Sequence, residues 1–434
     1  MRLLFVENRF KTFFWSEIVK KLRIDHDEIL VSWIVQNKKF KPKGEDCFVI
    51  NYPESSQLDS NYSCDFFKKL AKMDRGVYAF DSGTSHYYYY YQSIKNYINQ
   101  FKPDFVVGES TLFHELITIE VCKELGVKYI TPSTCRYPVG KFSLYVNGTL
   151  NVLNYRDYMV EDYHYQMIDD IVCRNKTPDY MKKQQGLKNA ILKFRLMYNK
   201  FFSLLSWFEG ERYNTPSPLK KLAITIENRI NKNKLEKISL KDCQSVDWEN
   251  TVLYPLQMQP ESNIDVWGYP YNDQTINLKR LVERLPPGKI VLIKPNPKSK
   301  YELSSDLVSL ISSLDNVYAI SSSISMDDIF DKVETIYTVT GTVAIEAVLS
   351  GKSVITEKSS KLLGYPNVSY LDSSDIKLSI PIYSKESLIS NLDGNSHFGL
   401  ISDPIFSDYS VSIENIENIC LALYSEIKMD YIKK

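Results

Sequence analysis

The feature that most constrains this chain is a unit of two short apolar runs joined by a turn and an amphipathic stretch. Residues 104–107 form a buried run, 108–110 read Gly-Glu-Ser, 112–125 have helical spacing, and 127–130 are apolar again. Two strands joined through a helix at this spacing pair in parallel with a right-handed crossover. The same rhythm returns between residues 251 and 356. The pattern predicts an α/β fold with two Rossmann-like, doubly wound domains.

The changes of pattern along the chain predict the domain boundaries. We expect an N-terminal α/β domain over residues 1–245, a C-terminal α/β domain over 246–412, and a closing helix over 413–434. Residues from about 155 to 245 read as a mostly helical insertion in the first domain.

Charge and aromatic content single out one part of that insertion. Between residues 181 and 240 there are thirteen Lys or Arg against four Glu, with aromatic residues interleaved. A basic, aromatic helical segment suits peripheral contact with the inner face of an anionic membrane, or with an anionic glycan. The alternative is a solvated helical insertion whose aromatic residues belong to the core.

Composition excludes several classes of protein. Lys plus Arg and Asp plus Glu both total 53, and this balance disfavours a nucleic-acid partner. The seven cysteines form no Cys-x-x-Cys pair, which disfavours a disulfide framework and a thiolate zinc site. The first apolar run is too short for a signal peptide, and no stretch approaches the roughly 20 apolar residues of a transmembrane helix. We therefore expect a cytoplasmic protein, soluble or peripheral at the membrane.

A turn between a strand and a helix is the first candidate binding element. The strand ends at Val339, Thr340-Gly341-Thr342 form the turn, and a helix follows. Amides and hydroxyls at a helix start form an anion site, so this turn is a candidate phosphate site. Glu346 lies one helical turn further on the same face and can accept the hydroxyls of a ribose. The alternative is an ordinary strand–helix unit with a glycine turn.

Two further strands of the C-terminal half end in polar residues. The strand from residue 289 delivers Lys294 and Asn296 at its carboxyl end, where doubly wound sheets bind ligands. Lys294 can offset the charge of a departing phosphate. The strand from residue 252 is followed by Gln257, Glu261 and Ser262, and a carboxylate there can act as base, nucleophile or ligand.

The N-terminal half offers candidates on the acceptor side. Glu109 stands at the carboxyl end of its strand, and Arg136 in the loop after the next strand can clamp an acidic sugar or a phosphate. His114, early in the following helix, is a weaker candidate for the same role. Asp25-His26-Asp27 matches a metal-binding pattern but connects a helix to a strand, and no histidine pair has metal-site spacing. We expect no metal and no cofactor.

Four strings together carry a family resemblance. They are PDFVVGES, YPLQMQPES, DQTINLKRLVERLPPGKIVLIKPNP and VTGTVAIEAVLSGKSVI, and the resemblance that they carry runs over residues 103–136 and 252–355, about a third of the chain. They resemble the capsular polysaccharide biosynthesis family, which includes bacterial β-Kdo transferases. The resemblance implies a GT-B fold, with two domains facing a cleft, and use of CMP-Kdo without a catalytic metal.

The resemblance also implies roles for individual residues. Glu261 and Ser262 match an acidic residue and a serine that follow a Pro-Leu-Gln string in the family, and Glu109 matches its Gly-Glu pair. The Ser/Thr-rich turn, here Thr340 and Thr342, is implied to hold the donor phosphate. The family usually reads Lys-Glu-His-Pro where this chain has Asn296 in place of the histidine. That histidine is implied to contact the nucleotide phosphate, and asparagine supplies a hydrogen bond but no cation.

These observations lead to a functional hypothesis. We expect a glycosyltransferase that moves Kdo or a related acidic sugar from a nucleotide donor, CMP-linked, to a lipid-linked or growing glycan of a bacterial capsule, O-antigen or lipopolysaccharide. Glu109 would deprotonate the acceptor, and Glu261 would stabilise or attack the anomeric carbon. The alternatives are a sugar-nucleotide epimerase or polyol-phosphate transferase on the same fold, and a non-catalytic glycan-binding subunit of a polysaccharide assembly complex.

Overall fold

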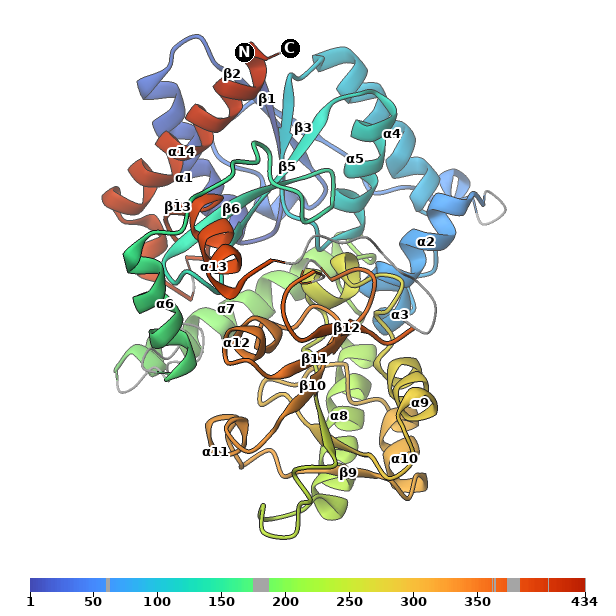
Figure 1. Ribbon diagram of the computed structural model, residues 1–434. Helices are drawn as coiled ribbons and strands as arrows, with labels where there is room; N and C mark the ends of the chain where they lie inside the picture. The colour runs from blue at the N-terminus through green and yellow to red at the C-terminus, as the bar shows by residue number, and fades with distance from the viewer. Residues whose placement is uncertain are drawn as a thin grey trace. The chain divides into compact units, whose positions relative to one another are not determined.

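The computed structural model describes residues 1–59, 63–174, 187–360, 362, 364–372, 383–404 and 406–433, without the side chains of residues 187–195 and 199. The chain forms two compact units (Figure 1). Unit 1 comprises Met1–Tyr158, Thr177–Pro218 and Asn391–Lys434, and unit 2 comprises Met159–Lys176 and Leu219–Ser390. Each unit has its own sheet and its own core, and each is described by itself.

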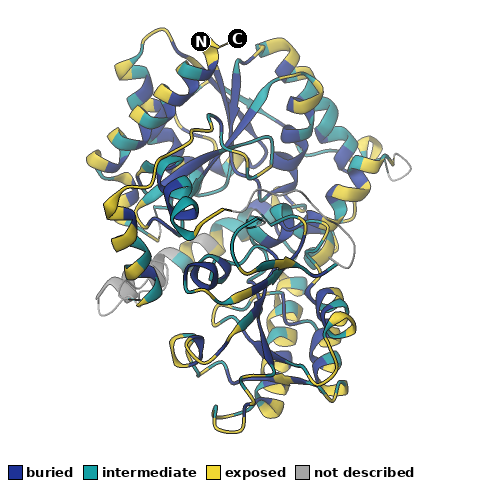
Figure 2. Ribbon diagram, viewed as in Figure 1, coloured by how far each residue is buried: buried dark blue, intermediate teal, exposed yellow. Residues whose placement is uncertain are grey.

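The sheet of unit 1 has the strand order β13-β6-β5-β4-β1-β2-β3. The strands from β5 to β3 in this order are parallel, whereas β6 and β13 join the edge antiparallel. The bounds are β1 (Arg2–Val6), β2 (Leu30–Val35), β3 (Cys47–Val49), β4 (Phe105–Val107), β5 (Lys128–Thr134), β6 (Lys141–Val146) and β13 (His397–Phe398). The central strands are buried along nearly their whole length, as expected where helices cover both faces of a sheet (Figure 2).

The helices and short helical turns of unit 1 connect and cover these strands. Their bounds are α1 (Lys11–Asp25), η1 (Lys38–Phe40), η2 (Ser55–Gln57), α2 (Asp65–Met73), α3 (Arg75–Phe80), α4 (Tyr87–Phe101), α5 (Phe113–Glu124), α7 (Leu187–Phe208), η5 (Asp408–Val411) and α14 (Ile413–Ile432). Helices α4 and α5 pack against each other, and α1 packs against α14.

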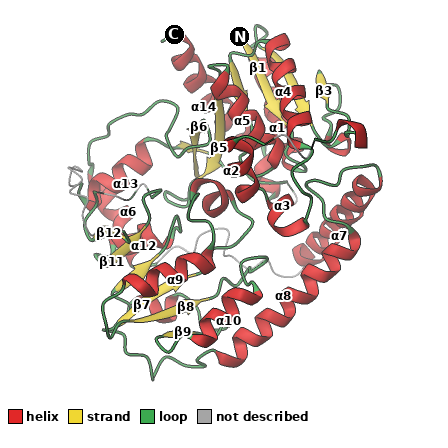
Figure 3. Cartoon of the chain, turned by 90° about the vertical axis from the view of Figure 1, so that its right-hand side faces the viewer, coloured by secondary structure: helices red, strands yellow, loops and turns green. Residues whose placement is uncertain are grey.

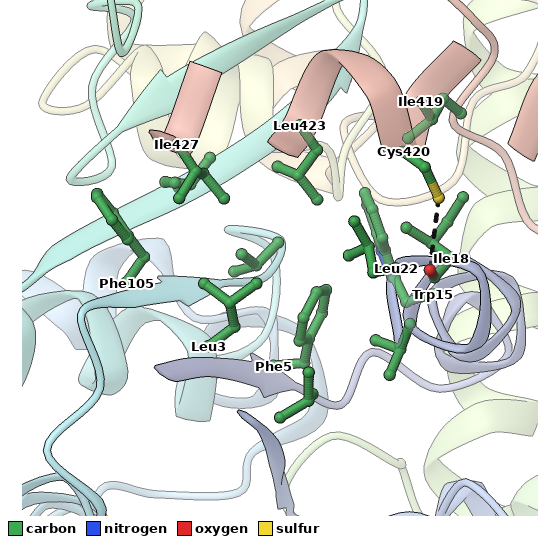
Figure 4. Packing of buried hydrophobic residues seen from close by; sticks show 14 of the residues in the cluster. Leu3, Phe5, Trp15, Ile18, Leu22, Phe105, Ile419, Cys420, Leu423 and Ile427 are labelled. Atoms are coloured by element: carbon green, nitrogen blue, oxygen red, sulfur yellow. Dashed lines mark hydrogen bonds between the residues drawn. The ribbon is translucent and has the colours of Figure 1, made fainter. Parts of the chain in front are cut away.

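The closing helix α14 belongs to the core of unit 1. Its residues Ile419, Leu423 and Ile427 are completely buried and lie in one apolar cluster with side chains of α1 and β1 (Figure 4). The Cys420 thiol also donates to the backbone carbonyl of Ile18 on α1 at 3.5 Å. The segment from residue 391 therefore leaves the predicted C-terminal domain and completes the N-terminal one.

Unit 2 contains an all-parallel sheet with the strand order β12-β11-β10-β7-β8-β9. Its strands are β7 (Thr251–Pro255), β8 (Ile290–Lys294), β9 (Val317–Ala319), β10 (Thr335–Tyr337), β11 (Ser353–Thr356) and β12 (Val368–Tyr370). Its helices are α6 (Asp162–Val172), α8 (Pro218–Ile238), η4 (Asn263–Trp267), α9 (Gln274–Arg284), α10 (Ser305–Ser313), α11 (Asp327–Phe330) and α12 (Val343–Leu349), and α13 (Lys385–Gly394) ends beyond the limit of the unit.

The helical stretch between the two sheets is divided between the units. Helices α6, α7 and α8 confirm its predicted helical character (Figure 3). Helix α8 nevertheless belongs to unit 2, because Leu235 lies in the core cluster of that unit and the Asn231 side chain donates to the Leu303 carbonyl at 2.8 Å. The boundary thus falls after Pro218 instead of near residue 245.

The predicted pair of doubly wound α/β domains is confirmed by these two sheets. The predicted arrangement of the domains around a cleft stays a prediction. Among the described residues, no helix combines the length and the apolar character needed to cross a bilayer.

Candidate functional site

Each sheet has one position where the order of its strands reverses. In unit 1, β1 lies between β2 and β4, and in unit 2, β7 lies between β8 and β10. Open α/β sheets bind ligands outside the carboxyl ends of the strands at such a reversal. We call the two positions the β1/β4 site and the β7/β10 site.

At the β7/β10 site, the side-chain amide of Gln257 joins the loops that follow the two strands. Its Nε2 donates to the Thr340 hydroxyl at 3.0 Å. Its Oε1 accepts from the Thr340 amide at 3.1 Å and from the Thr338 hydroxyl at 3.3 Å. The main chain of Gln257 exchanges hydrogen bonds with the Gln274 side chain at 2.8 and 2.7 Å. Gln257 is therefore a positioning residue that fixes the predicted phosphate turn.

The turn itself requires glycine at position 341. A Cβ on Gly341 would lie 2.5 Å from the Thr338 hydroxyl, which accepts from the Gly341 amide at 3.1 Å. The Thr340 hydroxyl donates to the Asn263 carbonyl at 2.7 Å. The amides of Thr340 and Gly341 are thus engaged within the protein. Thr342 directly precedes α12 without a side-chain capping bond, so of the three predicted residues it is the one best placed for a phosphate.

Lys294 ends β8, which pairs with β7, and β7 separates it from β10 and the turn. Its side chain is buried, and its ammonium donates to the Pro295 carbonyl at 3.4 Å. Within the part of the chain that the structure describes, no carboxylate forms an ion pair with it. Burial lowers the pKa of Lys294, while the charges of Glu236 and Asp328 act against that shift. A buried ammonium without a paired anion is poised to bind one.

Glu346 is held by a residue that the sequence analysis did not find. The Arg174 guanidinium donates to its carboxylate at 2.9 Å, forms an ion pair with Asp327 at 2.5 Å, and lies 4.8 Å from the ring centre of Phe330. Glu346 is buried, so the predicted ribose acceptor already has a cationic partner inside unit 2. No local pattern signals this pair, because 172 residues separate its members.

The remaining predicted residues of unit 2 lie in loops. The Glu261 amide donates to the Asp265 carboxylate at 2.9 Å, and Ser262 precedes the short helix Asn263–Trp267. The Asn296 side chain accepts from the Lys298 amide at 2.9 Å, which closes a local turn. Both loops follow the carboxyl ends of their strands, as predicted.

At the β1/β4 site, Glu109 is oriented from two sides. Its carboxylate accepts from the Lys11 ammonium at 2.9 Å, and its backbone carbonyl accepts from the Tyr129 hydroxyl at 2.6 Å. Gly108 allows this packing, because a Cβ there would overlap the Tyr129 hydroxyl. Lys11, at the start of α1, is another residue that the sequence analysis missed.

Two further polar residues follow β1 at this site. The Glu7 carboxylate is fully buried and accepts from the amides of Arg9 at 2.6 Å and Asn37 at 3.0 Å. Burial raises the pKa of Glu7 to about 7. Arg9 has a left-handed backbone (φ 46°) and donates to the Asn214 carbonyl at 2.9 Å and the Thr215 hydroxyl at 2.6 Å. These residues were missed although they directly follow a buried strand, the signal used for Glu109.

His114, which was predicted to contact the acceptor, lies in the interior of unit 1. His114 is completely buried, with Nε2 2.8 Å from the Glu7 carbonyl and Nδ1 3.4 Å from the Asn214 side chain. Burial also lowers its pKa, so the ring stays neutral. His114 therefore supports the loop after β1 and is closed to an acceptor. Arg136 is half-buried in the loop between β5 and β6. This loop starts at the carboxyl end of β5, which lies at the same edge of the sheet as the carboxyl end of β4.

Metal binding finds no support in the described ranges. No group of three or more His, Cys, Asp or Glu side chains there could hold an ion. The expected independence from metal and cofactor stays a prediction.

Comparison with protein families gives a match that contains the β7/β10 site. Residues 183–358 match the model of the family described as capsule polysaccharide biosynthesis protein. The predicted resemblance is confirmed over this segment. Of the predicted residues, those from Gln257 to Glu346 lie inside the match, whereas Glu109 lies outside it. No curated protein matches the chain in sequence.

Solved structures give distant likenesses. KpsC β-Kdo 2,7 transferase of Thermosulfurimonas dismutans aligns with a TM-score of 0.38 and 11% identity over 100% of both chains. KpsC β-Kdo 2,4 transferase of the same organism aligns with a TM-score of 0.33 and 12% identity, over 68% of this chain and 82% of its own length. UDP-GlcNAc 2-epimerase of Neisseria meningitidis, bound to UDP-GlcNAc, aligns with a TM-score of 0.26 and 13% identity. The alignment covers 99% of this chain and 100% of the epimerase chain. These TM-scores are too low to support a conclusion about the function of this chain.

Proposed function

We propose that this protein is a glycosyltransferase of capsule polysaccharide biosynthesis and that unit 2 binds its nucleotide-sugar donor. The observation that carries the proposal is the buried Lys294 ammonium, which stands at the carboxyl end of β8 without an ion-pair partner among the described residues. A donor diphosphate or monophosphate supplies the missing anion. The segment that matches the capsule family contains Lys294 and the other predicted donor-side residues from Gln257 to Glu346, which supports the same conclusion.

On the donor side, each residue has a distinct task. Lys294 offsets the charge that develops on the departing phosphate. Thr342 binds the phosphate oxygens at the end of the turn that Gln257 holds in place, and Asn296 contributes a hydrogen bond in place of the family's histidine. Glu346, oriented by Arg174, accepts the ribose hydroxyls. The resemblance favours CMP-linked Kdo or a related acidic sugar as donor.

On the acceptor side, Glu109 is the proposed general base. The Lys11 ammonium lies 2.9 Å from its carboxylate and orients that group, and a positioned carboxylate can accept the proton of an acceptor hydroxyl. Arg136 binds an acidic group of the acceptor, a lipid-linked or growing glycan. Glu261 stabilises or attacks the anomeric carbon.

Acceptor-dependent release of nucleotide tests the proposal. Purified protein is incubated with CMP-, UDP- and GDP-sugars, with and without capsular glycan fragments, and both nucleotide and sugar products are measured. Replacing Glu109 or Glu261 with Gln is expected to abolish transfer and leave the melting temperature unchanged. Glu120→Gln, on the partly exposed side of α5, is the matched control and should retain activity.

The alternatives give different results in the same assay. An epimerase converts the sugar nucleotide without an acceptor, and a polyol-phosphate transferase transfers from a CDP-linked polyol. A non-catalytic glycan-binding subunit binds glycan and releases no nucleotide. The observation in favour of this alternative is Asn296, which replaces the family's histidine and supplies no cation. Full activity of both the Glu109 and Glu261 variants would refute the assignment of these two carboxylates.

A further inference from the structure

Helix α7 presents an apolar stripe to solvent. Met197, Phe201, Leu204 and Phe208 recur at positions i, i+4, i+7 and i+11, and they are 61%, 55%, 39% and 67% exposed. This spacing places all four side chains on one face of the helix. Figure 3 shows α7 as one of the long helices of the chain.

The opposite face of α7 is the one that packs on unit 1. Phe202 lies against Phe10, with ring centres 6.5 Å apart, and the Ser206 hydroxyl donates to the Asn37 side chain at 3.4 Å. Helix α7 also packs against the short helix η1. The four residues of the exposed stripe are therefore not the ones that hold the helix on unit 1.

The sequence of helix α7 is basic, and Glu209, directly after the helix, forms an ion pair with Lys39 of η1 at 2.5 Å. Between Leu187 and Phe208 the sequence has Lys or Arg at positions 188, 193, 195 and 200 and no Asp or Glu. The neighbouring segment from η1 onward adds Lys38, Lys41 and Lys43, all exposed, together with the exposed Asp46. Aromatic and aliphatic side chains on one face, combined with Lys and Arg and without acidic residues, are the composition of a helix that lies in the surface of an anionic bilayer.

We propose that α7 docks unit 1 on an anionic lipid surface through the stripe formed by Met197, Phe201, Leu204 and Phe208. The inference rests on the proposed function in one respect, since it takes the acceptor glycan to be carried by a lipid. The loop that follows α7 leads directly to the β1/β4 site, where the Arg9 guanidinium binds the Asn214 carbonyl and the Thr215 hydroxyl. Docking of α7 thereby brings the predicted acceptor site to the surface that carries the acceptor.

Vesicle co-sedimentation of the full-length protein tests the inference. The vesicles consist of phosphatidylcholine alone or of an equimolar mixture with phosphatidylglycerol, at low and high salt. We expect binding to the anionic vesicles only, weakened by salt because the attraction is screened. The double variant Phe201→Gln/Phe208→Gln should lower the partition coefficient at least about tenfold, and this corresponds to about 1.4 kcal/mol.

A matched control uses exposed apolar residues elsewhere in unit 1. Ile413→Gln/Leu421→Gln changes two such side chains on α14 and should bind vesicles like the wild type. Equal binding of the α7 double variant, or equal binding to neutral vesicles, would overturn the inference. A fall in oligomeric state of the α7 double variant, seen by light scattering, would also overturn it and make the stripe a contact between protein chains.

The experiment separates this inference from the proposed function. Nucleotide release is measured for the same variants with a water-soluble glycan acceptor. Turnover by a wild-type protein that ignores vesicles would refute the docking inference alone. Vesicle binding by a protein that turns over no donor would refute the proposed function alone.

Discussion

Replacing Lys294 by Met removes the ammonium and keeps most of the side chain's length. The wild-type side chain is buried at the end of β8, and burial lowers its pKa below the ordinary value of 10.5. The unfolded state therefore binds more protons than the folded state between the two pKa values. The free energy of unfolding therefore rises as the pH increases between the two pKa values. Below the pKa of the folded state, Lys294 is charged in both states, and the folded state is destabilised by the full cost of burying the charge.

The variant should consequently change stability and binding in opposite directions. Relief of a buried, unpaired charge is worth about 1–3 kcal/mol of folding free energy, which raises the melting temperature by about 2–4 °C per kcal/mol in a domain of this size. Loss of a charge-assisted contact with phosphate costs about 1.5–3 kcal/mol of binding, equivalent to roughly 10- to 100-fold in affinity.

Scanning fluorimetry without ligand and calorimetric titration with nucleotide measure the two effects. Lys279→Met, on the exposed side of α9, is the control and should alter neither quantity. A Lys294→Met protein that is less stable and binds nucleotide as tightly as the wild type would refute the reasoning. Lys294 would then serve the packing of unit 2 alone.

Three further experiments, which use four substitutions, test the two sites. Gly341→Ala forces a Cβ to 2.5 Å from the Thr338 hydroxyl, so calorimetry should show a destabilisation of about 1–3 kcal/mol and weaker nucleotide binding; unchanged binding would contradict the role of the turn. Arg174→Met and Glu346→Gln, combined in a double-mutant cycle of melting curves, should show a coupling energy of about 1 kcal/mol or more, whereas additivity would show that their contact is inert. Because burial raises the pKa of Glu7 from 4.5 to about 7, its contribution to stability is fully present below pH 4.5 and is lost as the pH rises through 7, by about 3 kcal/mol. The melting temperature of Glu7→Gln should therefore fall less over this range than that of the wild type, and parallel curves would contradict the burial argument.

The sequence pattern was sufficient for the elements that local spacing determines. The strand–turn–helix order around Thr340 and Glu346, and the end of a strand at Lys294, appear in the structure where the apolar runs predicted them. Glu7 directly follows the buried strand β1, so the signal that marks Glu109, a polar residue at the carboxyl end of a buried strand, also marks Glu7.

Long-range pairs could not be predicted in this way. Arg174 reaches Glu346 across 172 residues, and Cys420 on α14 bonds to Ile18 on α1 across 402 residues. Such pairs form when helices and strands that are distant in sequence pack together, and the residue pattern of either segment does not indicate which residue of the other it contacts. The same cause explains why residues 391–412 were placed in the C-terminal domain and why the partner of the closing helix was not predicted.

A ligand-stabilisation screen tests the central claim, a nucleotide-sugar site in unit 2, most directly. The melting temperature is measured against CMP, CDP, UDP, GDP and their sugar conjugates. A ligand that binds only the native state adds about 2.7 kcal/mol of stability at a hundredfold excess over its dissociation constant. We predict stabilisation by one nucleotide class, with CMP the first candidate, and its loss in Lys294→Met. Absence of stabilisation by every nucleotide and conjugate would contradict the claim and favour a subunit that binds glycan without catalysis.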